Sequence, residues 1–334
     1  MTKVMGSGSP SIDLDEPARI PVRIVSKEDV ARRVVSLTLE RVDGGSFHSW
    51  DPGAHIDIHL SDELTRQYSL CPVPDGDGTR LRIAVLRESD SRGGSSRIHE
   101  HIAEGDLLAV SEPRNNFPLL ASRKYLFIAG GIGITPMLSM VERAHREQRD
   151  WTLYYLGSSS EDMAFAQSLR ERYGADRVEL HASSVAGRLD LRTILAMPRA
   201  HMLVYACGPA ALVDEVQDYC LGWPPGVLHA ELFSNDALGK GSNTDPFDIE
   251  LVRTGRTVTV GPDETVLDKL ERQGIRILSS CRAGLCGTCE VGVVRGDIEH
   301  RDAVLDDATK DAGDVMLVCV SRAAAGCHTL ALDI

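Results

Sequence analysis

The stretch Cys281-Arg-Ala-Gly-Leu-Cys286-Gly-Thr-Cys289 carries three cysteines within one short loop, and a fourth, Cys319, follows in the apolar run MLVCV. The spacing C-x4-C-x2-C with a distant fourth cysteine is typical of thiolates that hold a two-iron, two-sulfide cluster. Two glycines let the loop fold closely around such a cluster, and its N–H groups can then point at the sulfurs. The segment therefore predicts a 2Fe-2S centre.

A zinc site or a set of unrelated buried cysteines is the alternative interpretation. Zinc ribbons use paired C-x2-C or cysteine/histidine hooks, whereas here a four-residue gap comes first and the loop contains no histidine. Cys327 could replace Cys319 as the fourth ligand, but in the turn AAAGCHT a structural or exposed free thiol is expected. We therefore expect the metal ligands to be Cys281, Cys286, Cys289 and Cys319.

Length, charge and cysteine content restrict the number of domains, the classes of partner and the cellular location. A chain of 334 residues exceeds one ordinary core and predicts two or three domains. The net charge of −13 disfavours nucleic acid and anionic membranes as partners. No apolar run approaches the roughly 20 residues that cross a bilayer, and the N-terminus has neither the basic start nor the apolar stretch of an export signal. Eight cysteines are too few for a disulfide scaffold, so we expect a cytoplasmic protein.

The segments around the cysteine loop predict a small sheet with one helix. FDIELV and RTVTV alternate as strands of a hairpin joined by Thr254 and Gly255, and TVLDKLERQ predicts a helix that Gly274 ends. Further strands are expected at VGVV, VMLVCVS and TLALDI.

The middle of the chain alternates strands and helices, which predicts an α/β domain with a parallel sheet. From residue 124, KYLFIAGGIGITP reads as a strand, a turn containing Gly130, Gly131 and Gly133, and the start of a helix. The turn allows a close backbone approach, and the helix N-terminus offers N–H donors to a pyrophosphate. The dinucleotide fingerprint G-x-G-x-x-G is not completed, because Pro136 stands where its third glycine would be.

A second turn of the same kind, Ala206-Cys207-Gly208-Pro209, also leaves a strand and enters a helix. Both turns are therefore expected at the carboxyl edge of the sheet, where such sheets bind ligands. A small buried thiol is the alternative interpretation of Cys207.

Residues 17–118 contain several short alternating stretches, which predict an antiparallel β-barrel. Within them, RQYSL at 66–70 places Arg66 and Tyr68 on one face of a strand and Ser69 on the other. The loop RGGSS at 92–96 opens a predicted helix, RIHEHI, and could offer N–H groups and hydroxyls to a phosphate or remain a flexible surface loop. His99 is expected on the surface of that helix.

These motifs together resemble a known family. CRAGLCGTC resembles the loop of plant-type ferredoxins, GGIGITP with ACGP resembles the nicotinamide-binding half of the ferredoxin-reductase superfamily, and RQYSL resembles its RxYS flavin motif. Their order, with PRNNFPL at 113–119 as the crossing from barrel to sheet, is similar to the phthalate dioxygenase reductase and vanillate demethylase reductase family. The implied domains are a disordered lead-in (1–16), an FMN-binding barrel (17–118), an NAD(H)-binding α/β domain (119–234), a linker (235–246) and a β-grasp ferredoxin domain (247–334).

The resemblance also implies site residues. In the flavin domain the cofactor would contact Arg66, Gln67, Tyr68, Ser69, Ala84, Val85, Arg92, Gly93, Gly94 and Ser95. In the nicotinamide domain the residues expected to contact a cofactor are Gly130, Gly131, Gly133, Thr135, Pro136, Cys207, Gly208, Pro209 and Phe233. The catalytic residues would be Ser69, Thr135, Cys207 and Phe233. Phe233 would cover the flavin face, with an ordinary core position as the equal alternative.

The function implied is that of the reductase component of a multicomponent oxygenase. Electrons would pass from NADH through FMN, with FAD as the alternative, and the 2Fe-2S cluster to a Rieske-type terminal oxygenase that hydroxylates or O-demethylates an aromatic compound. A reductase serving a haem monooxygenase and a non-catalytic redox sensor are the alternatives. The loop LGSSSED at 156–162 lacks the arginine expected in the family, and serines 158–160 could contact a 2′-phosphate, so NADPH remains open.

Overall fold

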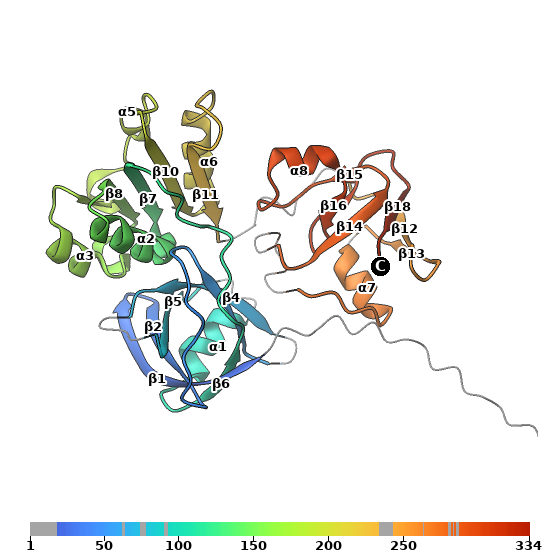
Figure 1. Ribbon diagram of the computed structural model, residues 1–334, viewed down its shortest axis with the longest axis horizontal. Coiled ribbons are helices and arrows are strands. Elements are labelled where there is room, and N and C mark those ends of the chain that lie inside the picture. Colours follow the sequence, from blue (N-terminus) through green and yellow to red (C-terminus); the bar gives the residue numbers. More distant parts are fainter. Residues whose placement is uncertain are drawn as a thin grey trace, which may run out of the picture.

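The computed structural model describes residues 19–61, 64–73, 78–89, 93–233, 243–262, 264–279, 282, 284 and 287–334. Its strands form a closed barrel, a parallel sheet and a smaller mixed sheet, in that order along the chain (Figure 1). Each has its own buried apolar cluster, which confirms the predicted multidomain fold class. The lead-in expected at 1–16, and residues 235–242 of the expected linker, lie outside the described residues.

The barrel is antiparallel and closes through pairing of its first and last strands. In hydrogen-bonded order the strands are β1 (Ile20–Ala31), β2 (Val34–Arg41), β5 (Arg80–Leu86), β4 (Thr65–Cys71), β3 (His55–His59) and β6 (Leu107–Val110). Along β1, Ile20, Val22 and Ile24 are buried in the barrel while the residues between them are exposed, as the two-residue period of a strand requires. Helix α1 (Gly94–His101) buries Ile98 in the same core.

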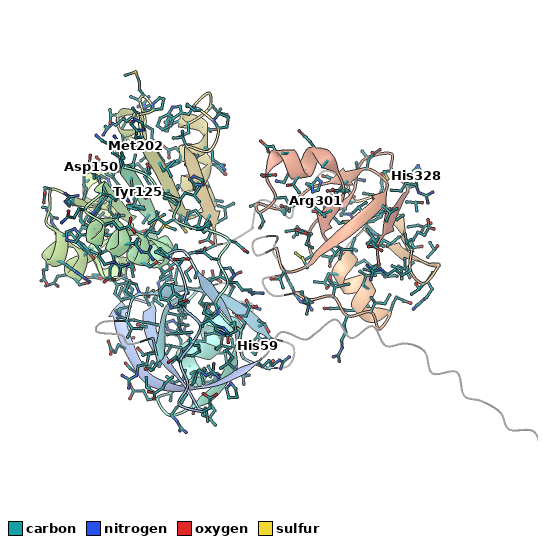
Figure 2. The ribbon with its side chains drawn as sticks, in the orientation of Figure 1. His59, Tyr125, Asp150, Met202, Arg301 and His328 are labelled. Carbon is teal, nitrogen blue, oxygen red and sulfur yellow. The ribbon has the colours of Figure 1, made fainter. Side chains whose placement is uncertain are left out.

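The second sheet is parallel throughout. Its order is β11 (Leu228–Leu232), β10 (Met202–Gly208), β7 (Lys124–Gly130), β8 (Asp150–Gly157) and β9 (Val178–Ala182). The central strand is apolar on both sides: Tyr125 (Figure 2) and Phe127 belong to one buried cluster, and Leu126 and Ile128 to the other. Such a continuous apolar run is typical of a parallel strand covered on both faces.

Helices cover both faces of this sheet. Met137 and Met140 of α2 (Ile134–Arg146) pack into the cluster that contains Phe127, and Val216 of α6 (Ala210–Tyr219) packs into the opposite cluster. The remaining segments are η1 (Gly131–Gly133), η2 (Ser160–Asp162), α3 (Ala166–Tyr173), α4 (Ser183–Ala186) and α5 (Leu191–Ile194).

The third sheet is mixed and lies beside the other two units (Figure 1). Its order is β13 (Arg256–Val260), β12 (Phe247–Leu251), β18 (Thr329–Leu332), β14 (Glu290–Arg295) and β16 (Val315–Leu317), with a separate pair β15 (Ile298–Glu299) and β17 (Arg322–Ala323). Helix α7 (Val266–Arg272) begins with a capping box between Thr265 and Asp268 and buries its apolar face against the sheet, while α8 (Asp307–Ala312) is surface-exposed. Buried Arg301 (Figure 2) donates to the Asn243 carbonyl and to Glu299.

Local patterns predicted most of these elements. The hairpin at Thr254 and Gly255 and the helix ending before Gly274 are confirmed. The strand expected over 315–321 is too long, because it ends at Leu317. The N–H groups of Val320 and Ser321 both donate to the Leu317 carbonyl, so the chain turns where Cys319 lies. Among the described residues, no helix combines the length and apolarity needed to span a bilayer.

A tight turn of the barrel sits directly on the segment that leads to the parallel sheet. Gly53 has φ +94°, and a methyl group added there would lie 1.9 Å from the carbonyl oxygen of Phe117. Its N–H faces the Ser139 hydroxyl of α2 at 3.4 Å. At this point of the junction the close approach therefore requires a residue without a side chain.

We predict that Gly53→Ala lowers the free energy of unfolding by more than about 2 kcal/mol, because the new methyl group meets backbone in a left-handed conformation. Gly105 has φ +92° with open space around it, so Gly105→Ala tests conformational strain alone and should cost about 1 kcal/mol. Denaturant unfolding of both variants measures the difference. Equal losses would contradict the close contact at Gly53.

Candidate functional site

The first site lies where β4 meets the N-terminus of α1. A methyl group added at Gly94 would lie 2.6 Å from Cγ and 2.7 Å from Nε of Arg66, so the arginine stem crosses this glycine directly. Gly93 precedes the helix with φ +87°. The fold thus brings together Arg66 and the Gly-Gly-Ser turn, which are 27 residues apart along the chain.

This arrangement has the chemistry of an anion site. The first N–H groups of α1 have no carbonyl partner within the helix, and the positive end of the helix dipole adds to the charge of Arg66. Ser95 is buried in the first turn, and its hydroxyl accepts from the N–H of Glu88. A phosphate group fits here as the ligand of Arg66 and the helix. Arg92, which was also expected to contribute, lies outside the described residues.

The neighbouring residues of the expected flavin site line β4 and β5. Ser69 is buried on β4, Gln67 and Tyr68 are half-buried, and burial raises the pKa of the Tyr68 hydroxyl. On β5, Ala84 and Val85 are buried. The sequence placed His99 on the helix surface, but its Nε2 lies 2.9 Å from the carbonyl oxygen of Val85. That carbonyl is therefore engaged by the protein itself.

The two glycine turns of the parallel sheet touch each other through their backbones. A methyl group at Gly133 would lie 2.2 Å from the carbonyl oxygen of Cys207, and one at Gly208 would lie 2.9 Å from Cα of Gly130. Side chains at these positions would separate the turns. The structure thus brings both motifs to the carboxyl edges of the adjacent strands β7 and β10, where a dinucleotide can approach the backbone.

Thr135 and Cys207 lie beneath this edge. The Thr135 hydroxyl is buried and donates to the Ile132 carbonyl at 3.0 Å, and the Thr135 carbonyl lies 3.9 Å from the Cys71 thiol of the barrel. Cys207 is fully buried, and burial followed by the charge of Glu231 raises its thiol pKa well above the ordinary value. The thiol is therefore neutral at physiological pH. Pro136 follows Thr135 in the first turn of α2, and Pro209 precedes α6.

Sequence patterns predict no role for Glu231. It lies opposite Cys207 in the register of β10 and β11. Its Oε2 is buried with no hydrogen-bond partner among the described residues, and burial raises the carboxyl pKa to about 8. The sequence feature that could have indicated this site is an acidic residue near the end of the strand that follows the Ala-Cys-Gly-Pro turn. Two residues later, Phe233 packs partly buried against the core that contains α2.

Two of the four expected cluster ligands belong to the described residues. Cys289 is 2% exposed at the start of β14, and Cys319 is 3% exposed in the turn after β16. These segments are neighbours, because the Val318 N–H donates to the Cys289 carbonyl at 3.2 Å. The Gly284 N–H donates to the Cys319 sulfur at 3.3 Å, which is the backbone-to-sulfur contact a cluster loop needs. Cys281 and Cys286 lie outside the described residues.

The structure separates Cys327 from this group. The Cys327 sulfur accepts from the N–H of Asp297 at 3.3 Å, beyond the far end of β14 from Cys289. At about 3.4 Å per residue, that strand spans about 20 Å. A single two-iron cluster cannot bridge this distance, so Cys319 is the ligand that the fold favours.

Comparisons with known proteins assign two parts of the chain to known domain families. Residues 249–324 match the family described as 2Fe-2S iron-sulfur cluster binding domain, and residues 127–218 match the family described as oxidoreductase NAD-binding domain. The vanillate O-demethylase oxidoreductase of Pseudomonas sp. (strain HR199 / DSM 7063) is 37% identical over 318 residues, which cover 94% of this chain and 100% of that protein.

Several solved structures are similar over 95% of the chain. One is a phthalate dioxygenase reductase, described as a modular structure for electron transfer from pyridine nucleotides to 2Fe-2S, with 35% identity, a TM-score of 0.71 and 98% of its chain covered. Another is an intact type IV self-sufficient cytochrome P450 monooxygenase, with 36% identity and a TM-score of 0.83, of which this chain spans 41%. Similarity to the vanillate enzyme over its full length shows the family: the chain belongs to the phthalate dioxygenase reductase and vanillate O-demethylase reductase family.

Proposed function

We propose that this protein is the reductase of a multicomponent oxygenase, taking a hydride from NADH and passing electrons one at a time to a terminal oxygenase. The observation that carries the proposal is the presence in one chain of three sites of matching chemistry: the anion site at Arg66, the paired turns at Gly133 and Cys207, and the buried thiols Cys289 and Cys319. A nicotinamide gives two electrons together, whereas an iron-sulfur cluster accepts one, so a flavin between them divides the pair.

The residues of the first two sites would position the flavin and the nicotinamide against each other. Arg66, Gly94 and the N–H groups of α1 would bind the terminal phosphate of FMN, and the single compact anion site supports FMN over FAD. Ser69 and Thr135 would hold the flavin beside the nicotinamide. The glycine turns would admit the pyrophosphate, and the backbone of the Cys207–Gly208 turn would face the nicotinamide. The Cys207 thiol, buried beneath that turn, would stay neutral and add no charge where a hydride moves.

Contacts of the loop after β8 support NADH over NADPH. Arg32 of the barrel donates to both carboxylate oxygens of Asp162 and holds the pKa of that carboxyl at about 2. The Ser159 hydroxyl donates to the same carboxylate at 2.9 Å, so this serine is already engaged. The loop therefore offers a 2′-phosphate one serine donor fewer.

The terminal acceptor proposed is a Rieske-type oxygenase acting on an aromatic compound. A plant-type cluster near about −400 mV lies at least about 250 mV below a Rieske centre, a drop of about 6 kcal/mol per electron. The match to a self-sufficient cytochrome P450 favours a haem monooxygenase as the second candidate. We also propose the cytoplasm as the location, because it supplies NADH and keeps the ligand thiols reduced.

Turnover separates these enzymes from a sensor. Cluster-loaded protein supplied with NADH should reduce cytochrome c and should drive product formation by a Rieske oxygenase added to it. Cluster-loaded protein that reduces neither acceptor would support a sensor instead.

We predict that Cys319→Ser loses iron and sulfide and reduces cytochrome c at a rate at least about tenfold lower, because a four-thiolate cluster loses one ligand. Cys327→Ser is the matched control and should keep its iron, its sulfide and the wild-type rate of cytochrome c reduction. Iron and sulfide assays and the visible spectrum measure the outcome. The ligand assignment is wrong if Cys327→Ser empties the site while Cys319→Ser leaves it filled.

Arg66→Gln should raise the dissociation constant of the flavin about tenfold to a hundredfold, because a charge-assisted hydrogen bond to phosphate is lost. Arg66→Lys keeps the positive charge but lacks the planar guanidinium group, so its dissociation constant for the flavin should lie between those of the wild type and Arg66→Gln. Fluorescence of flavin released on dilution measures both, and extraction identifies FMN or FAD. Unchanged retention in Arg66→Gln would contradict the phosphate site.

Glu231 predicts a specific pH dependence of stability. Folding raises the pKa of its carboxyl from 4.5 to about 8, so the stability it contributes is full below about pH 4.5, declines as the pH rises and is lost above about pH 8. Glu231→Gln removes this titration. The variant should match the wild type in melting temperature at pH 5 and exceed it at pH 9. A difference that is the same at both pH values would show that Glu231 does not titrate in this range.

A further inference from the structure

The segment that connects the barrel to the parallel sheet runs beside β3. His55 and Arg114 exchange both backbone hydrogen bonds, with N···O distances of 2.8 and 3.0 Å. The segment is therefore fixed to the barrel at this point.

The side chain of Arg114 joins the barrel to the cysteine loop of the third unit. One guanidinium nitrogen donates to Asp57 of β3, whose side chain is 5% exposed. The other, Nη1, donates to the hydroxyl of Thr288 at 3.4 Å. Thr288 lies between the expected ligands Cys286 and Cys289, so the barrel contacts the loop that would surround the cluster.

A second close approach lies one residue away on the cysteine loop and two residues away on the connecting segment. A methyl group added at Gly287 would lie 4.0 Å from Nδ2 of Asn116. Successive residues of the cysteine loop thus face the same short stretch of the barrel connection. The contact is local and small, so the loss of one hydrogen bond there can shift the balance between docked and undocked units.

Asp57, which binds the Arg114 side chain, lies on the strand next to the one expected to contact the flavin. In the register of β3 and β4, His55 is paired with Ser69 and Asp57 with Gln67. Arg114 is therefore separated by a single strand from the residues expected at the flavin, and by a single hydrogen bond from the cysteine loop. Since Asp57 is buried, its ion pair keeps the arginine in place while the longer bond to Thr288 can open.

We propose that Arg114 is a positioning residue for electron transfer between the flavin and the cluster, and that it acts through the hydroxyl of Thr288. The inference rests on the function proposed above. In this step one electron would leave the reduced flavin and one ferric ion of the cluster would become ferrous. The terminal oxygenase would take that electron before the second one passes, so the pair from NADH needs two passages. Because electron transfer slows steeply with distance, the step depends on how often the loop is docked.

The test compares Thr288→Val with Thr288→Ser in the full-length protein loaded with flavin and cluster. Valine keeps the size of threonine but cannot accept the hydrogen bond, and serine keeps the hydroxyl. After anaerobic mixing with NADH, stopped-flow absorbance follows flavin reduction and then cluster reduction. We expect an unchanged first phase in both variants, a second phase about three- to tenfold slower in Thr288→Val, and a wild-type second phase in Thr288→Ser.

Two arginine variants extend the test. Arg114→Gln should slow the second phase at least as much, and it should also lower the melting temperature because the buried ion pair with Asp57 is lost. Arg295→Gln is the control, since Arg295 forms an exposed ion pair with Glu250 within the third unit. It should change neither phase.

Other outcomes overturn the proposal. An unchanged second phase in Thr288→Val, or the same slowing in Thr288→Ser, would show that the hydroxyl does not position the loop. A slower second phase accompanied by a shifted cluster reduction potential would assign the effect to driving force. Failure of the proposed function looks different, because wild-type protein would then lack iron or would show no flavin reduction by NADH.

Discussion

Electrons in this protein have to pass between three separately packed cores, and that constraint governs the rest of the structure. The barrel, the parallel sheet and the third sheet each close around their own apolar residues, so the reacting groups can meet only where loops protrude from the cores. The expected site residues lie at such edges: Arg66 beside a helix N-terminus, Gly133 beside Cys207, and Cys319 in a turn. Stability therefore comes from the cores and chemistry from the places where they end.

Small polar contacts align these edges across the units. Gly53 lies against the Phe117 carbonyl, Arg32 is paired with Asp162, and Arg114 lies between Asp57 and Thr288. The barrel and the parallel sheet also share a small apolar cluster, in which Val34, Cys71 and Ala84 pack with Ala164. The contact of the barrel with the third unit through Arg114 is polar, and polar interfaces of this kind permit relative motion of the units. The same sparse contacts are therefore the places where single substitutions can separate one redox step from the next.

The sequence predicted features that depend on short-range patterns. The cysteine spacing, the glycine turns, the hairpin at Thr254 and the three-part architecture all follow from residues close together along the chain. The features that the sequence did not predict depend on pairing between segments that are distant along the chain. The burial of Glu231 follows from its register with Cys207, the contact of His99 requires β5 to lie beside α1, and Arg114 meets Thr288 across 174 positions of the sequence. Cys319 was placed in a strand because the apolar run MLVCV continues past the turn.

The contact between the two glycine turns distinguishes two edges of the parallel sheet. The turns after β7 and β10 cannot accept larger residues, whereas the loop after β8 is not restricted by this contact. Gly133 and Gly208 have no space for a side chain, so the sheet edge at these two turns tolerates little variation. Ser159 and Asp162 follow β8, which borders β7 on the side away from β10. An engineer seeking a different coenzyme preference can therefore work on that loop while the geometry around Cys207 stays intact.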